Sequence, residues 1–175
     1  MSPDIIRPAV VSIFAVLVLV AAMRDLVSFT IPNWISLALA GAFLPAALIV
    51  GLPLPTIAWC GGVGIAMLVV GVGMFAMRWI GGGDAKLMAA ASLWLGLQGL
   101  APFVIYTALA GGALALLLLG MRSAWVRPFA AGGPPWVDRL ATPGGSAPYG
   151  VAIALGALLA FFQQGVLLGA GHVGF

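Results

Sequence analysis

Long apolar runs, repeated along almost the whole chain, limit most strongly what this sequence can fold into. There are six, at residues 5–23, 34–50, 56–77, 87–97, 102–121 and 149–170. Most are close to the ~20 residues that an α-helix needs to cross ~30 Å of hydrocarbon. A soluble domain needs a polar exterior, which 6% charged residues cannot provide when 63% are hydrophobic. The sequence therefore predicts one all-α domain, residues 1–175, that is a polytopic membrane protein with about six transmembrane helices.

Two of these runs need interpretation. The first resembles a secretory signal, but its charged front is weak and no clear cleavage site follows, so we expect a retained helix. The fourth is too short to span a bilayer unless its helix begins back at Asp84. That start would place the aspartate on the first helical turn.

Basic residues are gathered between alternate spans. Six of the seven Lys and Arg follow the first, third or fifth run, namely Arg24, Arg78, Lys86, Arg122, Arg127 and Arg139. Only Arg7 falls on the other side. By the positive-inside rule the basic side is cytoplasmic, so both termini are expected in the periplasm of a Gram-negative cell.

The connections between the runs follow from this topology. Short turns at residues 51–55 and 98–102 are expected outside the cell. Residues 122–147 form the one long cytoplasmic loop, whose GGPP and TPGG stretches argue against a stable helix through its middle. Trp125 and Trp136 in this loop are suited to the membrane interface.

The four acidic residues, all aspartates, differ in their expected depth in the membrane. Asp4 and Asp138 are expected to be solvated. Asp25 and Asp84 each lie at the cytoplasmic end of an apolar helix, so the topology brings them to the same membrane face. Ionisable groups at a membrane boundary are costly and most often functional. The alternative is that each only ends a helix beside a basic residue, Arg24 or Lys86.

A pair of aspartates makes a definite chemistry possible. One ionised carboxylate takes a proton from water while the other, protonated, donates a proton to the carbonyl oxygen of a peptide bond. Like charges in proximity disfavour ionising both groups, so the pair shares a proton. The glycines at 81–83 allow close backbone approach beside Asp84. Lys86 points about 200° away from Asp84 on a helix, which favours a role at the interface over an ion pair with it.

Other site chemistries do not fit. IGGGDAK lacks the order of a phosphate loop or of a dinucleotide fold, and no basic stripe interleaved with aromatics suggests nucleic-acid binding. Cys60, the only cysteine, is expected to pack in the core, and His172 to be a tail residue. We predict no metal and no cofactor. Small-residue contacts between helices are expected at Gly61, Gly64, Gly71 and Gly111.

Two stretches resemble the type IV prepilin peptidases, the G-x-G-D class of aspartic membrane peptidases. They are DLVSFTIPN at residues 25–33 and GGGDAKLMAAASLWLG at residues 81–96. The resemblance implies that Asp25 and Asp84 are catalytic and that Gly81 and Gly83 are the motif glycines. PYGVAIA at residues 148–154 is similar to the last helix of that family.

The resemblance also implies a substrate and a subtype. The substrate would be a prepilin or pseudopilin, with a basic leader followed by a hydrophobic helix, cut at their junction on the cytoplasmic side of the bilayer. Bifunctional members carry a further amino-terminal region, commonly with cysteine pairs, that is implicated in methylation. Its absence before Asp25 implies a small peptidase-only member, similar to the TadV or CpaA type of tight-adherence (Flp) pilus systems. Pro32 and Asn33 are expected to start the second helix, with Asn33 as its cap.

The competing hypothesis is a membrane protein without enzymatic activity. A small carrier, or a scaffold of a secretion machine, could use the two aspartates to bind a proton or a cation. Carriers often contain repeated halves with helices broken near the midplane, and neither feature is apparent here. No prediction of the oligomeric state follows from the sequence.

Overall fold

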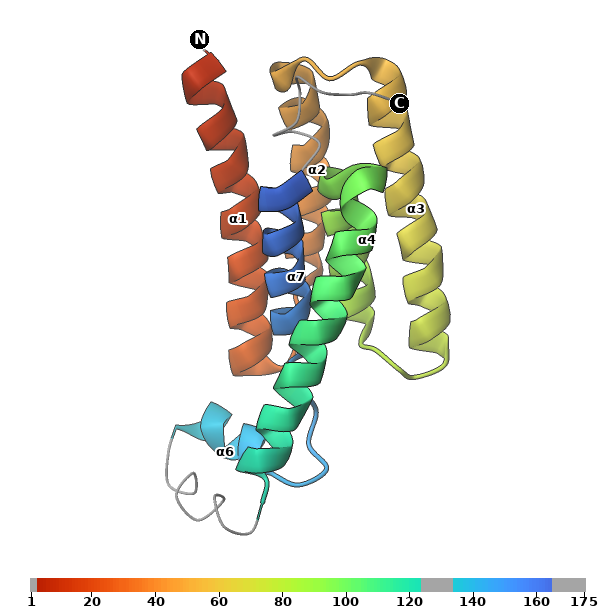
Figure 1. Ribbon diagram of the computed structural model, residues 1–175. Helices are drawn as coiled ribbons and strands as arrows, with labels where there is room; N and C mark the ends of the chain where they lie inside the picture. The colour runs from red at the N-terminus through yellow and green to blue at the C-terminus, as the bar shows by residue number, and fades with distance from the viewer. Residues whose placement is uncertain (1–2, 124–133, 165–175) are drawn as a thin grey trace.

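The computed structural model describes residues 3–123 and 134–164, with side chains described for residues 8–123 and 134–163. All regular structure in these ranges is helical (Figure 1). The helices are α1 (Pro3–Ser28), α2 (Asn33–Val50), α3 (Leu54–Ala76), α4 (Gly82–Met121), α6 (Pro135–Ala141) and α7 (Tyr149–Gln164). The expectations for Trp125, Arg127, His172 and the side chains of Asp4 and Arg7 fall outside this description.

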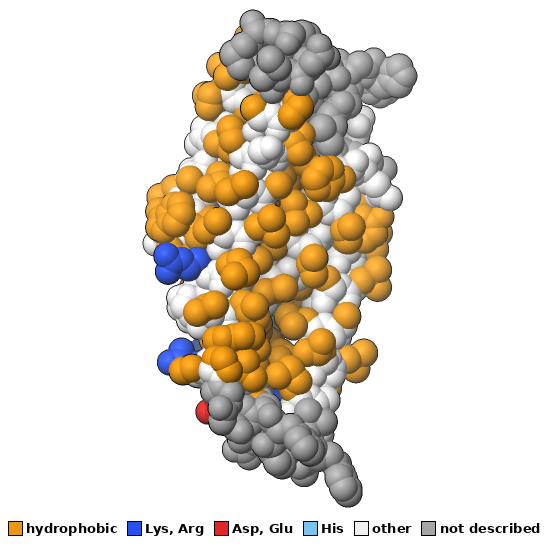
Figure 2. All heavy atoms as spheres, turned by 90° about the vertical axis from the view of Figure 1, so that its left-hand side faces the viewer, with side chains coloured by type: hydrophobic (Ala, Val, Ile, Leu, Met, Phe, Trp, Pro, Cys, Tyr) orange, Lys and Arg blue, Asp and Glu red, His pale blue; other side chains and the backbone are white. Residues whose placement is uncertain are grey.

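The helices have the length and surface of a membrane protein. Four of them, α1 to α4, are long and apolar enough to cross a bilayer, and α7 is a shorter apolar helix. Large hydrophobic side chains on α1 point outward, and Figure 2 shows hydrophobic side chains spread over the face on that side of the molecule. The all-α, polytopic class predicted from the apolar runs is confirmed.

Helix α4 contains two spans rather than one. Gly96 interrupts it with φ 62° and ψ −168°, a backbone conformation that glycine adopts without steric cost. The segments on either side of Gly96 run in opposite directions (Figure 1), and they correspond to the fourth and fifth apolar runs. The predicted turn at residues 98–102 is wrong, because these residues are helical and the chain reverses at Gly96. The first segment begins at Gly82, so Asp84 does lie on its first turn.

An aromatic cluster joins four of the helices. The rings of Phe14 on α1 and Phe161 on α7 are stacked with centroids 4.2 Å apart. Trp94 on α4 contacts both rings and also Phe43 on α2. The Trp94 indole N–H donates a hydrogen bond of 2.8 Å to the carbonyl oxygen of Leu39, so its one polar atom is paired inside the core.

Helix α3 is held mainly through small residues that face α4. A Cβ atom on Gly64 would meet the Leu93 side chain, and one on Gly71 would meet Ala85. Close helix contact at these two glycines is therefore confirmed. Gly61, by contrast, faces open space, so the packing role predicted for it is wrong. Cys60 is buried in the core, as expected.

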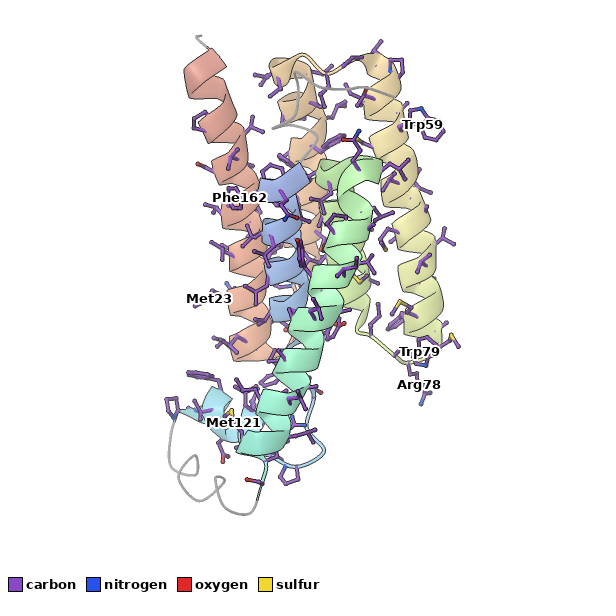
Figure 3. The ribbon with its side chains drawn as sticks, in the orientation of Figure 1. Met23, Trp59, Arg78, Trp79, Met121 and Phe162 are labelled. Carbon is purple, nitrogen blue, oxygen red and sulfur yellow. The ribbon has the colours of Figure 1, made fainter. Side chains whose placement is uncertain are left out.

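Two exposed tryptophans mark the ends of α3. Trp59 and Trp79 both point outward, near opposite ends of the helix (Figure 3). About 17 helical residues, or ~26 Å at 1.5 Å per residue, separate Trp59 from the end of α3, and Trp79 follows in the next turn. This separation is close to the ~30 Å thickness of the hydrocarbon core. Tryptophan is enriched at both membrane interfaces, so one interface is expected beside Trp79 and Arg78.

The connection after α4 contains a helix that the sequence analysis did not predict. Helix α6 spans Pro135–Ala141 and packs beside the C-terminal end of α4 (Figure 1). The Arg122 guanidinium, at the end of α4, donates to the carbonyl oxygens of Leu140 and Ser146 over 2.9 and 3.1 Å. These two hydrogen bonds hold the segment between α6 and α7 against the C-terminal end of α4.

Candidate active site

The Asp25 carboxyl group is held at the start of α7. Asp25 lies in the last turn of α1, is only 5% exposed, and its Oδ2 accepts a hydrogen bond of 2.6 Å from the backbone N–H of Gly150. The first N–H groups of a helix have no partner within the helix, and its dipole favours a negative charge there. A buried carboxylate at this position is thus compensated by the N-terminus of α7.

Only a glycine fits at position 150. A Cβ atom there would lie 2.8 Å from Asp25 Oδ2, 3.0 Å from Asp25 Cβ and 2.7 Å from Ile31 Cδ1. The absence of a side chain lets the α7 backbone approach Asp25 closely enough to donate its N–H.

Asp84 is oriented by the glycine that precedes α4. Its Oδ2 accepts a hydrogen bond of 3.1 Å from the backbone N–H of Gly81, three residues earlier. This contact uses an N–H group that the start of the helix leaves free. Asp84 remains more accessible than Asp25, being half-buried rather than buried.

Ile31 brings the starts of α4 and α7 together around the two aspartates. A Cβ on Gly83 would lie 3.0 Å from Ile31 Cβ, while Ile31 Cδ1 also contacts Gly150. Asp25 contacts Gly150, and Asp84 directly follows Gly83, so both aspartates flank Ile31. The structure thus brings together the two aspartates that the sequence analysis paired, at the end of the bundle where α1 stops and α4 begins.

The three glycines before Asp84 differ in the space around them, which gives a first prediction. A Cβ on Gly82 would meet only the Phe75 ring, at 3.5 Å or more, whereas one on Gly83 would press on the Ile31 backbone and side chain. We expect Gly83→Ala to lower the stability of the detergent-solubilised protein by about 1–3 kcal/mol, as overpacking does. Gly82→Ala should leave stability unchanged or slightly higher, because it reduces the entropy of the unfolded chain. Thermal unfolding of the two variants side by side tests this, and equal losses would contradict it.

Lys86 and Asn33 contact each other rather than the aspartates. The Lys86 ammonium donates a hydrogen bond of 2.8 Å to Asn33 Oδ1. The capping role predicted for Asn33 is wrong: Pro32 occupies the N-cap position of α2 and Asn33 is the first helical residue. Its amide oxygen is instead used to join α2 to the first turns of α4.

Sequence reasoning missed the contribution of residues 149 and 150. The sequence PYG indicates only a resemblance to a family helix, yet Gly150 supplies the N–H that holds Asp25. Tyr149 packs its ring against Gly111 of α4, where a Cβ would lie 2.7 Å from the ring. The available signal was a glycine directly after an aromatic residue at the start of an apolar span.

Nothing in the described part of the chain gathers three or more His, Cys, Asp or Glu side chains into a metal-binding group. The arrangement is two carboxyl groups at one end of the bundle, each of which accepts a hydrogen bond from a backbone N–H group. Such a pair can exchange protons with a water molecule and a carbonyl group.

A protein-family model matches more than half of the chain. The model of the type IV leader peptidase family matches residues 12–116, a range that includes both aspartates. No curated protein and no solved structure matches the chain.

Proposed function

Because the chain belongs to the type IV leader peptidase family, we propose that it is an aspartic endopeptidase in which Asp25 and Asp84 activate one water molecule. The observation that supports the proposal is that Asp25 and Asp84 lie around Ile31 at the same end of an apolar helical bundle, with Asp25 buried against the N-terminus of α7. Burying a carboxyl group in this way is costly, and such groups in membrane proteins are usually functional.

In the proposed reaction, both aspartates are held through one oxygen and act through the other. Backbone N–H groups of Gly150 and Gly81 contact Oδ2 of Asp25 and of Asp84. We propose that the Oδ1 atoms of the two aspartates contact the attacking water molecule and the carbonyl oxygen of the substrate. The ionised carboxylate removes a proton from the water, which attacks the peptide carbonyl carbon, while the protonated carboxyl group donates to the carbonyl oxygen. As the tetrahedral intermediate collapses, the carboxyl group that took the proton from water gives it to the leaving amine and the C–N bond breaks. The other carboxylate recovers its proton from the hydroxyl group of the intermediate, so both aspartates return to their starting states.

The proposed substrate is a prepilin or pseudopilin with a basic leader and a hydrophobic helix. The basic residues whose side chains are described lie at the bundle end that carries the aspartates, or beyond it on α4 and α6: Arg24, Arg78, Lys86, Arg122 and Arg139. The positive-inside rule places this end at the cytoplasmic face of the bacterial inner membrane. In a precursor inserted in the membrane, the junction between the leader and the hydrophobic helix would lie at this same cytoplasmic face. Within the family we propose the small TadV or CpaA type of Flp pilus systems, acting without methyltransferase activity.

Co-expression with a pilin precursor tests the proposed function. We expect the wild-type protein to convert an epitope-tagged precursor, carrying a basic leader and one hydrophobic helix, into a product shorter by the mass of the leader. Intact mass of the purified pilin gives the cut position. A precursor that keeps its full mass beside wild-type protein would favour a carrier or a scaffold instead.

A further inference from the structure

An open groove runs between α2 and α3, with α4 as its floor. Its volume is about 370 Å³. Leu37 on α2 and Ile65 on α3 form its rims and are 71% and 66% exposed, so the groove opens to the surface that faces lipid. Its other walls are small or aliphatic residues: Ala40, Gly64, Leu68, Ala89, Ala90 and Leu93. Small residues along a helix let a second helix approach closely.

One end of the groove is polar. Asn33 and Lys86, joined by their hydrogen bond, lie there together with Ser36. Ser36 is 6% exposed, and its hydroxyl finds no hydrogen-bond partner among the residues that the structure describes. A buried hydroxyl left without a partner costs about 1–3 kcal/mol, which a bound group with an acceptor atom would recover.

We propose that this groove receives the hydrophobic helix of the substrate, an inference that rests on the proposed peptidase function. A helix lying along α4 leaves the groove past Asn33 and Lys86. Lys86 lies about 3 Å along the axis of α4 from Asp84, so the two residues are at nearly the same depth although their side chains point about 200° apart. The junction between that helix and its leader then emerges at the first turn of α4, beside the more accessible aspartate. The groove accepts one row of side chains, as in ridge-into-groove packing, and Ser36 donates to a carbonyl or side-chain oxygen of the bound helix.

Photo-crosslinking tests the position of the bound helix. The Asp84→Asn variant retains uncut precursor, and p-benzoylphenylalanine is introduced at Ile65 or, as the matched control, at Val70. Val70 is similarly exposed at 55% but lies five positions along α3, about 140° around the helix and outside the groove. We expect the epitope-tagged precursor to crosslink from position 65 and this crosslink to be lost at position 70, because only Ile65 lines the groove.

Equal crosslinking at both positions, or adducts only with lipid at position 65, would overturn the groove assignment. Wild-type protein is assayed in the same cells. If it removes the leader while no precursor crosslinks from position 65, the groove assignment fails and the peptidase function stands. If it does not remove the leader, the function on which the assignment rests fails as well.

Ser36 provides a second test that does not depend on crosslinking. Ser36→Ala removes an unpartnered buried hydroxyl, so we expect unchanged or higher stability. Leader removal should nevertheless slow by about threefold, the size of a typical hydrogen bond between membrane helices. Thr107→Val is the matched control, since the Thr107 hydroxyl is also buried without a partner in the described residues but lies away from the groove. Equal rates for Ser36→Ala and wild type would contradict a contact between Ser36 and the substrate.

Discussion

Replacing Asp84 or Asp25 by asparagine should abolish removal of the leader from a co-expressed precursor. Asparagine keeps the shape of the side chain but can neither accept a proton from water nor deliver one to a carbonyl oxygen at neutral pH. Losing one proton-transfer group costs about 10²–10⁴-fold in rate, so no product should be visible in the time in which wild type completes the reaction. The measurement is the fraction of processed pilin on an immunoblot, with the amount of each variant in the membrane fraction determined in parallel.

Asp138→Asn is the control for this pair. Asp138 is exposed on α6, which agrees with the prediction that it is solvated. The Asp138→Asn variant therefore removes one carboxylate and leaves the candidate active site unchanged. It should process the precursor at the wild-type rate. Retained processing by either Asp25→Asn or Asp84→Asn, at wild-type protein levels, would show that the two aspartates do not act as a catalytic pair.

The general architecture could be predicted because hydropathy and helix length are local properties. A run of about twenty apolar residues is long enough to predict a membrane-spanning helix by itself. The basic residues then fix which ends of the spans share a face, and Asp25 and Asp84 are paired by topology alone. That pairing required no knowledge of how the helices pack.

The wrong predictions concern local features that depend on how the helices pack against one another. The reversal occurs at Gly96, inside an apolar stretch, rather than at Gln98 to Pro102, because a single glycine with positive φ suffices to turn the chain. Asn33 was expected to cap its own helix, but a lysine 53 positions later takes its amide oxygen. The space around Gly61 also depends on where α3 meets α4, which periodicity does not reveal.

The environment of Asp25 likewise could not be predicted from its own neighbours in the chain. Its hydrogen-bond donor is 125 positions away, at the start of the last described helix. Ile31, which spaces α4 from α7, is an ordinary aliphatic residue without any sequence signal of its role. The acid pair therefore depends on three helix ends, those of α1, α4 and α7, that only the folded bundle brings together.

Because the acid pair depends on the start of α7, we also expect a large loss of leader removal when Gly150 is replaced. In Gly150→Ala the new methyl group would lie 2.8 Å from Asp25 Oδ2 and 2.7 Å from Ile31 Cδ1, so the Asp25 carboxyl group must move away from the N–H of residue 150. A displacement of about 1 Å at a catalytic group costs on the order of 10²-fold in rate, and we expect leader removal to fall by about that factor. The overpacked contact should also cost about 1–3 kcal/mol of stability.

Gly112→Ala separates the loss of the Asp25 contact from a general effect of adding methyl groups to helices. Apart from its chain neighbours and the nearby backbone of its own helix, no atom lies within 4 Å of a Cβ built on Gly112, which belongs to α4. This variant should process the precursor normally and unfold at the wild-type temperature or slightly above, since alanine favours a helix over glycine by about 1 kcal/mol. Leader removal by Gly150→Ala is therefore compared with Gly112→Ala at equal amounts of folded protein in the membrane. Equal rates for the two would mean that the Gly150 N–H does not position Asp25 for the reaction, and that α7 contributes only to packing.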